Sequence, residues 1–160
     1  MKVLVAYFSH SGNTKILAEK ISDITRGTIF TIDPVKVYPT DYQTVVDQAK
    51  KEINADFKPE LKTGIENIDE YDTIFIGSPN WWGTVAPPVA TFLTSYEFRG
   101  KKIIPFITHE GSRLGRTVSD INRLCPDSDV LEALPVRGSL VTKAENDVKT
   151  WLRETRIISQ

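Results

Sequence analysis

The segment KVLVAYFSHSGNT, residues 2–14, decides the fold, because it joins an apolar run to a turn of small polar residues. Residues 3–8 carry no charged side chain, which is typical of a parallel strand buried on both faces. Apolar residues then recur at helical spacing over 13–25, which predicts an amphipathic helix. The segment therefore predicts a buried strand, a tight turn and a helix, the opening unit of a parallel α/β sheet.

The rest of the chain alternates in the same way. Further strands are expected at 27–33, 71–78, 101–109 and, more weakly, within 130–138, with an extended peripheral segment at 35–39. Helices are expected after an Asp41 N-cap, from Pro87 to Tyr96, over 118–124, and after a capping box formed by Thr142 and Glu145. Pro105 inside the fourth strand predicts a local bulge. The alternation predicts one parallel sheet of about five strands with helices on both faces.

The composition excludes several classes of protein. The chain has 160 residues and a formal net charge of -1, so we expect one domain over 1–160 and no partner held by bulk charge, neither nucleic acid nor membrane. The single cysteine, Cys125, excludes a disulfide framework and a cysteine-based zinc site, and it fits a cytoplasmic protein. We expect structure from Lys2 onward, with no signal peptide.

Three loops fall at the carboxyl edge of the predicted sheet, where ligands of such sheets bind. The first, residues 9–14, opens a helix, whose N-terminus offers free N–H groups and a partial positive charge. Its hydroxyl and amide side chains add neutral donors, and Gly12 permits a tight turn. The loop predicts a phosphate site; the alternative is a capped helix, because Ser, Asn and Thr also cap helices well.

Other phosphate chemistries lack their motifs in this sequence. Neither the G-x-x-x-x-G-K-[ST] loop of nucleoside triphosphatases nor the G-x-G-x-x-G dinucleotide fingerprint occurs. Residues 7–8 and 77–78 stand where a receiver domain would need acidic residues, and the first loop has no cysteine to act as a phosphatase nucleophile.

The other two loops suggest a flat ring beside the phosphate. Residues 78–84, SPNWWGT, place two adjacent tryptophans at the ligand edge, where they could form an aromatic wall or pack into the core. Residues 108–115, THEGSRLG, could face the same ligand or form an ordinary solvated loop. Together the three loops predict a site for a mononucleotide with a planar ring.

With these three motifs in order, the whole chain resembles the short-chain type of the flavodoxin family. The resemblance implies a flavodoxin-like three-layer α/β/α sandwich with strand order 2-1-3-4-5, and FMN as cofactor. It places the phosphate at Ser9, His10, Ser11, Gly12, Asn13 and Thr14, with His10 at a variable position. It places the ring at Pro79, Asn80, Trp81, Trp82 and Gly83. It places the pyrimidine side at Thr108, His109, Glu110, Gly111 and Ser112.

The resemblance implies electron transfer through the bound flavin, with no catalytic side chain and no metal. We expect a one-electron carrier between reductase and acceptor proteins; the alternative is an NAD(P)H-dependent reductase of quinones or similar flat acceptors. The third loop lacks the aromatic residue usual in carriers, which favours the reductase, while small size and the missing nicotinamide fingerprint favour the carrier. We expect a monomer or weak homodimer. His10 could point to solvent, and His109 could either support its loop or contact the flavin.

Overall fold

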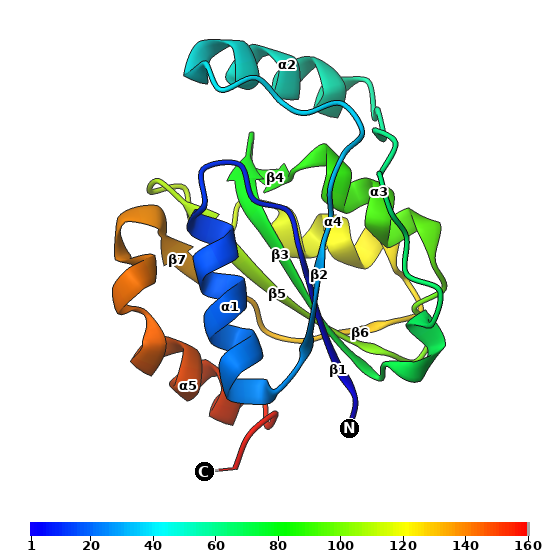
Figure 1. Ribbon diagram of the computed structural model, residues 1–160, viewed down its shortest axis with the longest axis vertical. Coiled ribbons are helices and arrows are strands. Elements are labelled where there is room, and N and C mark those ends of the chain that lie inside the picture. The colour runs from blue at the N-terminus through cyan, green and yellow to red at the C-terminus, as the bar shows by residue number, and fades with distance from the viewer. Residues whose placement is uncertain (160) are drawn as a thin grey trace.

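The computed structural model describes residues 1–159 and contains the predicted parallel sheet (Figure 1). The sheet order is β2-β1-β3-β5-β6, with β7 also pairing with β5. These strands are β1 (Val3–Tyr7), β2 (Thr28–Thr31), β3 (Thr73–Trp81), β5 (Lys102–His109), β6 (Asp129–Val130) and β7 (Leu134–Arg137). Counted by position, the order is second, first, third, fourth, fifth, so the predicted fold class is confirmed.

The fifth strand is divided into β6 and β7, and Pro105 explains the division. Lys102 pairs with Asp129 whereas Phe106 pairs with Leu134, so the fifth strand carries one extra residue opposite Pro105. The Ile103 carbonyl faces the fifth strand, since it accepts from the Leu131 N–H. Because backbone groups alternate along a strand, the backbone of residue 105 faces the fifth strand too, and proline has no N–H to donate there. The register between β3 and β5 is unbroken. The predicted bulge therefore lies in the neighbouring strand.

Helices cover both faces of the sheet (Figure 1). One face packs against α1 (Asn13–Thr25) and α5 (Glu145–Glu154), the other against α3 (Pro87–Ser95) and α4 (Thr117–Leu124). Successive residues of the central strands alternate between the two cores, as the period of a strand requires. Gly77 is needed in β3, because a Cβ there would collide with the ring of Phe106. Two buried apolar layers thus fix the sheet that carries the site.

The helix α2 (Tyr42–Asn54) lies outside these two layers, over the carboxyl edge of the sheet (Figure 1). The chain reaches it through residues 33–41 and returns through 55–67, and an isolated antiparallel bridge joins Pro34 to Leu61. A short 3-10 turn, η1 (Ile68–Glu70), then leads into β3. Segment 35–39 forms no regular strand.

The predicted capping box at Thr142 is wrong. Residues Gly138–Lys143 form a 3-10 helix, η2, and α5 begins at Glu145 without a side-chain cap. Tertiary contact explains this, because Gly138 lies against Asn13 and Glu110 so closely that a Cβ would collide with both side chains. None of the helices in the part of the chain described is long and apolar enough to cross a bilayer.

Candidate functional site

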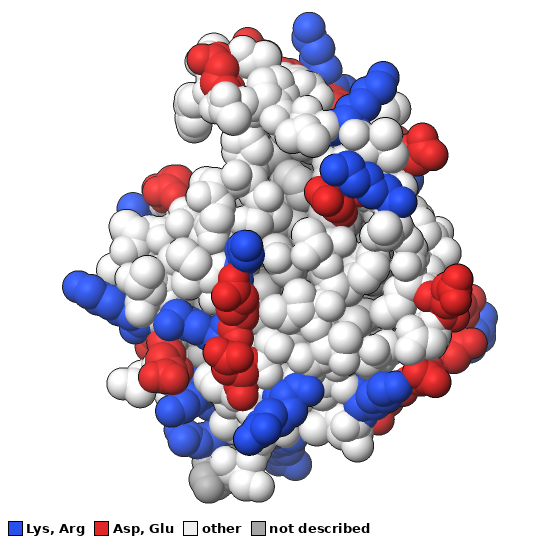
Figure 2. Space-filling view, viewed as in Figure 1, with Lys and Arg blue, Asp and Glu red and all other residues white. Residues whose placement is uncertain are grey.

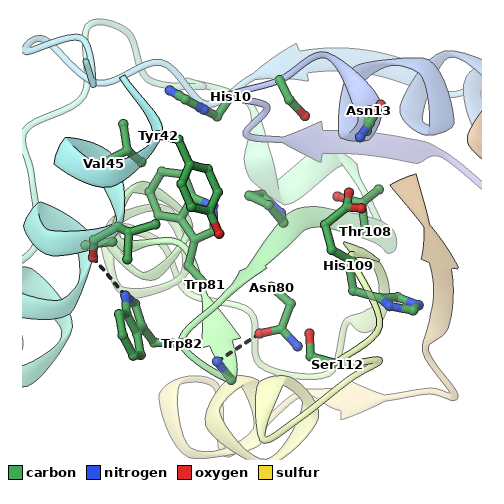
Figure 3. Close-up of a pocket in the computed structure, with 16 residues that line it drawn as sticks. His10, Asn13, Tyr42, Val45, Asn80, Trp81, Trp82, Thr108, His109 and Ser112 are labelled. Atoms are coloured by element: carbon green, nitrogen blue, oxygen red, sulfur yellow. Dashed lines mark hydrogen bonds between the residues drawn. The ribbon is translucent and has the colours of Figure 1, made fainter. Parts of the chain in front are cut away.

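A cavity of about 630 Å³ opens at the carboxyl edge of the sheet, between the three predicted loops and α2 (Figure 3). Its size lies in the usual range for small-molecule and cofactor sites. Twelve of the sixteen predicted residues line it: His10, Ser11, Asn13, Pro79, Asn80, Trp81, Trp82, Gly83, Thr108, His109, Glu110 and Ser112. The other four, Ser9, Gly12, Thr14 and Gly111, belong to the same loops but do not line the cavity.

The first loop is a tight turn that opens α1 at a glycine. Gly12, the N-cap of α1, has a φ of 99°, a left-handed conformation that favours glycine. It has no side chain to cap the helix, and no atom lies within 4 Å of where its Cβ would be. The Ser9 hydroxyl oxygen accepts from the N–H groups of Gly12 and Lys15 at 3.1 and 3.2 Å. Ser9 thus binds two N–H groups at the start of α1, which is the capping arrangement that the sequence also allowed.

Thr14 does not face the cavity. Its hydroxyl lies 2.8 Å from that of Thr108 and is buried, so it connects the first loop to the third.

The second loop is a β-hairpin, which corrects the prediction that strand three ends at Ser78. Trp81 and Asn80 belong to β3 and pair with β4 (Thr84–Val85). The two residues of the turn, Trp82 and Gly83, both have positive φ, 55° and 83°. This is the type I′ geometry that suits two-residue hairpins. The hairpin makes the Trp81 backbone part of the sheet rather than of a mobile loop.

The Trp81 indole is held by three other rings. Phe8, Tyr38 and His10 each contact it edge-to-face, with ring centroids 5.4, 5.1 and 5.8 Å away. Such edge-to-face contacts are favourable for aromatic pairs. Trp81 thus packs against the core and also lines the cavity.

Trp82 has a different role from Trp81. Its indole Nε1 donates to the Val46 carbonyl of α2 at 2.9 Å, and the Lys50 ammonium lies 5.1 Å from its ring centroid. The side chain touches the cavity but mainly holds α2 against the hairpin.

The third loop is supported by His109. Its Nδ1 accepts from the Gly111 N–H at 2.9 Å, so Nδ1 carries no proton and the ring is neutral. Burial, and then the guanidinium groups of Arg137 and Arg113, lower the pKa of His109 below its usual 6.5. The structure thus shows His109 supporting its loop, which is one of the two roles predicted for it.

Asn80 ties the second loop to the third. Its Oδ1 accepts from the Gly83 N–H at 2.9 Å, and its Nδ2 donates to the Arg113 carbonyl at 2.8 Å. Both halves of the amide are thus occupied by backbone, which fixes its orientation.

His10 is exposed, as expected, yet it is bonded. Its Nε2 lies 2.8 Å from the Pro39 carbonyl, and because a carbonyl can only accept, Nε2 carries the proton. The bond joins the first loop to the segment that leads into α2.

Sequence reasoning missed four residues that line the cavity from α2: Tyr42, Val45, Val46 and Ala49. Their apolar stripe predicts a helix with one buried face, but it does not say what that face covers. The three prolines in the connecting segments, at 34, 39 and 59, are a weak signal that this helix is held away from the sheet. Among residues 1–159, no group of three or more His, Cys, Asp or Glu side chains could hold a metal ion.

Several known proteins are similar to this chain. A NAD(P)H dehydrogenase (quinone) of Cupriavidus metallidurans is 35% identical over 92 residues, which are 58% of this chain and 45% of that protein. That match reaches less than half of the relative's length. A candidate flavoprotein of Bacteroides eggerthii superimposes with a TM-score of 0.85 at 31% identity, covering 96% of each chain.

A flavoprotein of Lactobacillus acidophilus, solved in complex with FMN, superimposes with a TM-score of 0.73 at 31% identity, covering 89% of this chain and 97% of that one. The family model described as Flavodoxin matches residues 2–155, nearly the whole chain. This protein therefore belongs to the flavodoxin family.

Proposed function

We propose that this protein binds FMN in the cavity and transfers electrons through it. The observation that carries the proposal is that one cavity is lined both by polar residues at the start of α1, His10, Ser11 and Asn13, and by the fixed Trp81 indole. The first suits a phosphate and the second a conjugated ring. The FMN complex of the Lactobacillus acidophilus relative supports the same ligand.

Each loop has a proposed task. The backbone of 9–14, with the side chains of Ser11 and Asn13, would hold the phosphate through neutral donors. Trp81 would pack against the ring, and Asn80 would keep the two ring loops in register. The backbone of 108–112 would face the polar side of the ring. FMN itself supplies the redox chemistry, since it accepts and returns electrons.

Within this function we propose a reductase of flat acceptors that takes its electrons from NAD(P)H. The net reaction moves two electrons and two protons, so that NAD(P)H, a proton and a quinone give NAD(P)⁺ and a hydroquinone. The third loop has no aromatic residue that could cover the proposed ring from that side. The quinone dehydrogenase of Cupriavidus metallidurans also supports this proposal.

The test compares two acceptors with one preparation of FMN-loaded protein. Oxidation of NADH or NADPH is followed with 1,4-naphthoquinone and, separately, with cytochrome c as a one-electron protein acceptor. The proposal expects turnover of NAD(P)H with the quinone that does not need a separate reductase. No oxidation of NADH or NADPH above the rate of free FMN would refute the reductase.

A one-electron carrier is the second candidate. The flavodoxin model matches nearly the whole chain, whereas the match to the quinone dehydrogenase covers 58% of it. Against a carrier, Figure 2 shows acidic and basic side chains mixed over one face, rather than the broad acidic field that steers a carrier to basic partners. Electron delivery to cytochrome c only when a separate reductase is added would favour the carrier.

We also propose a cytoplasmic location. Cys125 is buried, its Sγ lies 3.6 Å from the Leu93 carbonyl, and burial raises its pKa to about 11. A thiol of this kind is unreactive, and a chain with one such cysteine has no need of an oxidising compartment. Protein fractionation of the source cells would test this location.

A further inference from the structure

The cavity wall formed by α2 has no charged side chain. It consists of Tyr42, Val45, Val46 and Ala49, whereas the sheet edge opposite supplies hydroxyl, amide and backbone groups. Among the described residues that line the cavity, Glu110 is the only Asp, Glu, Lys or Arg. The site thus has a polar side, which suits a cofactor with a phosphate, and an apolar side formed by α2. A charged ligand against that apolar side would lose hydration without gaining a partner.

Bonds from two of the three proposed cofactor loops reach α2 or the segment that leads into it. The indole of Trp82 in the hairpin donates to the Val46 carbonyl, and His10 in the first loop donates to the Pro39 carbonyl. A third bond joins the Tyr38 hydroxyl to the Glu52 carboxylate on α2 at 2.5 Å. These bonds fix the position of α2 relative to the hairpin and the first loop.

Tyr42 is the first residue of α2 and lines the cavity (Figure 3). Its side chain is 80% exposed although its backbone is fixed, because the Asp41 carboxylate caps the helix by accepting from the Thr44 N–H at 3.0 Å. An exposed tyrosine ring on a fixed backbone beside an open cavity offers a large apolar face, and ordering its two side-chain torsions costs little entropy. Tyr42 is thus prepared to contact a ring that enters the cavity.

We propose that the α2 wall binds the electron acceptor, an uncharged planar ring, and that Tyr42 is its specificity-determining residue. The proposal rests on the function above, because it assumes that FMN occupies the polar side of the cavity. The proposal adds where the electron acceptor binds and that this acceptor is uncharged. A planar ring gains contact with Tyr42 and with the aliphatic side chain of Val45, whereas an anionic ring finds no basic side chain on this wall.

The experiment measures binding rather than turnover. Oxidised, FMN-loaded protein is dialysed to equilibrium against 1,4-naphthoquinone, which the oxidised flavin does not reduce, and against its 2-sulfonate. The variants are Tyr42→Ala, Tyr42→Phe and the control Phe57→Ala. Phe57 is also exposed, at 52%, and lies just beyond α2 without lining the cavity. The Kd of FMN is measured for each variant by flavin fluorescence.

The proposal makes four expectations. Tyr42→Ala raises the Kd of naphthoquinone roughly 3- to 10-fold, the range expected for loss of one aromatic contact. Tyr42→Phe and Phe57→Ala leave that Kd unchanged. All three variants keep the wild-type Kd of FMN. The sulfonate binds wild-type protein at least about tenfold more weakly than the uncharged quinone.

Several outcomes would overturn the inference while leaving FMN binding intact. The first is that naphthoquinone does not bind, and the second is that Tyr42→Ala leaves its Kd unchanged. The third is that Tyr42→Phe raises this Kd as much as Tyr42→Ala does. The fourth is that the sulfonate binds as tightly as the uncharged quinone. An equal loss of FMN and quinone affinity in Tyr42→Ala would also overturn it, by assigning the wall to the cofactor. Failure of wild-type protein to bind FMN would instead refute the proposed function itself.

Discussion

The hydroxyls of Thr14 and Thr108 lie 2.8 Å apart, although 94 residues separate them in the sequence. Thr14 belongs to the first turn of α1, and Thr108 is the last residue but one of β5. Both side chains are buried, so the bond is shielded from water and fixes the first loop against the third. The two sides of the proposed FMN site are therefore positioned by the core beneath them.

Removing one hydroxyl of this pair should destabilise the protein, and removing the second as well should cost little more. Thr14→Val leaves a buried hydroxyl without its partner, which costs about 1–3 kcal/mol of unfolding free energy. The double variant Thr14→Val/Thr108→Val should lose less than the sum of the two single variants, because no polar atom is left unpaired. Urea unfolding of the four proteins measures this coupling. Additive losses would show that the hydroxyls do not interact.

Gly77→Ala should destabilise the sheet where β3 meets β5. The added Cβ would collide with the Phe106 ring, and overpacking of this kind costs about 1–3 kcal/mol. The double variant Gly77→Ala/Phe106→Leu should lose less than the sum of its single variants, since the smaller side chain makes room. Thermal unfolding tests this, and a Gly77→Ala protein as stable as the wild type would contradict the packing described here.

Local patterns predicted most of the fold and far less of the site's outer wall. Residues 2–25 could be assigned directly, since an apolar run, a polar turn and a helical period each act within a few residues. The position of α2 could not, because Val45 and Ala49 indicate a buried face without indicating its neighbour. The η2 turn at 138–143 depends on contact with Asn13, which is distant in sequence. Long-range contacts of this kind leave no periodic signal.

Trp82→Phe should loosen α2 without disturbing the rest of the fold. The phenyl ring keeps most of the packing near Lys50 but cannot donate to the Val46 carbonyl, and one hydrogen bond contributes about 0.5–1.5 kcal/mol. Hydrogen exchange of peptides from 42–54 should therefore speed up, while peptides from α5 keep their protection. Unchanged exchange in α2 would show that the indole does not anchor it.

The stability of the protein should decrease as the pH falls below about 6.5, the usual pKa of histidine. The folded pKa of His109 is lower than that value, so the unfolded chain takes up the proton first and stability is lost as the pH falls toward the folded pKa. His109→Asn removes this contribution to the pH dependence. Urea unfolding at pH 7.5 and 5.5 measures it, and an NMR midpoint for the His109 ring at or above 6.5 would contradict the assignment.

The most direct test of the central claim is a titration of apoprotein with FMN, followed by flavin fluorescence. We expect quenching that saturates at one FMN per chain, and an affinity roughly tenfold or more weaker in Trp81→Ala, because that variant removes the fixed ring of the site. Fluorescence that follows free FMN throughout the titration, in wild-type protein as in Trp81→Ala, would show that the cavity at the sheet edge is not a flavin site.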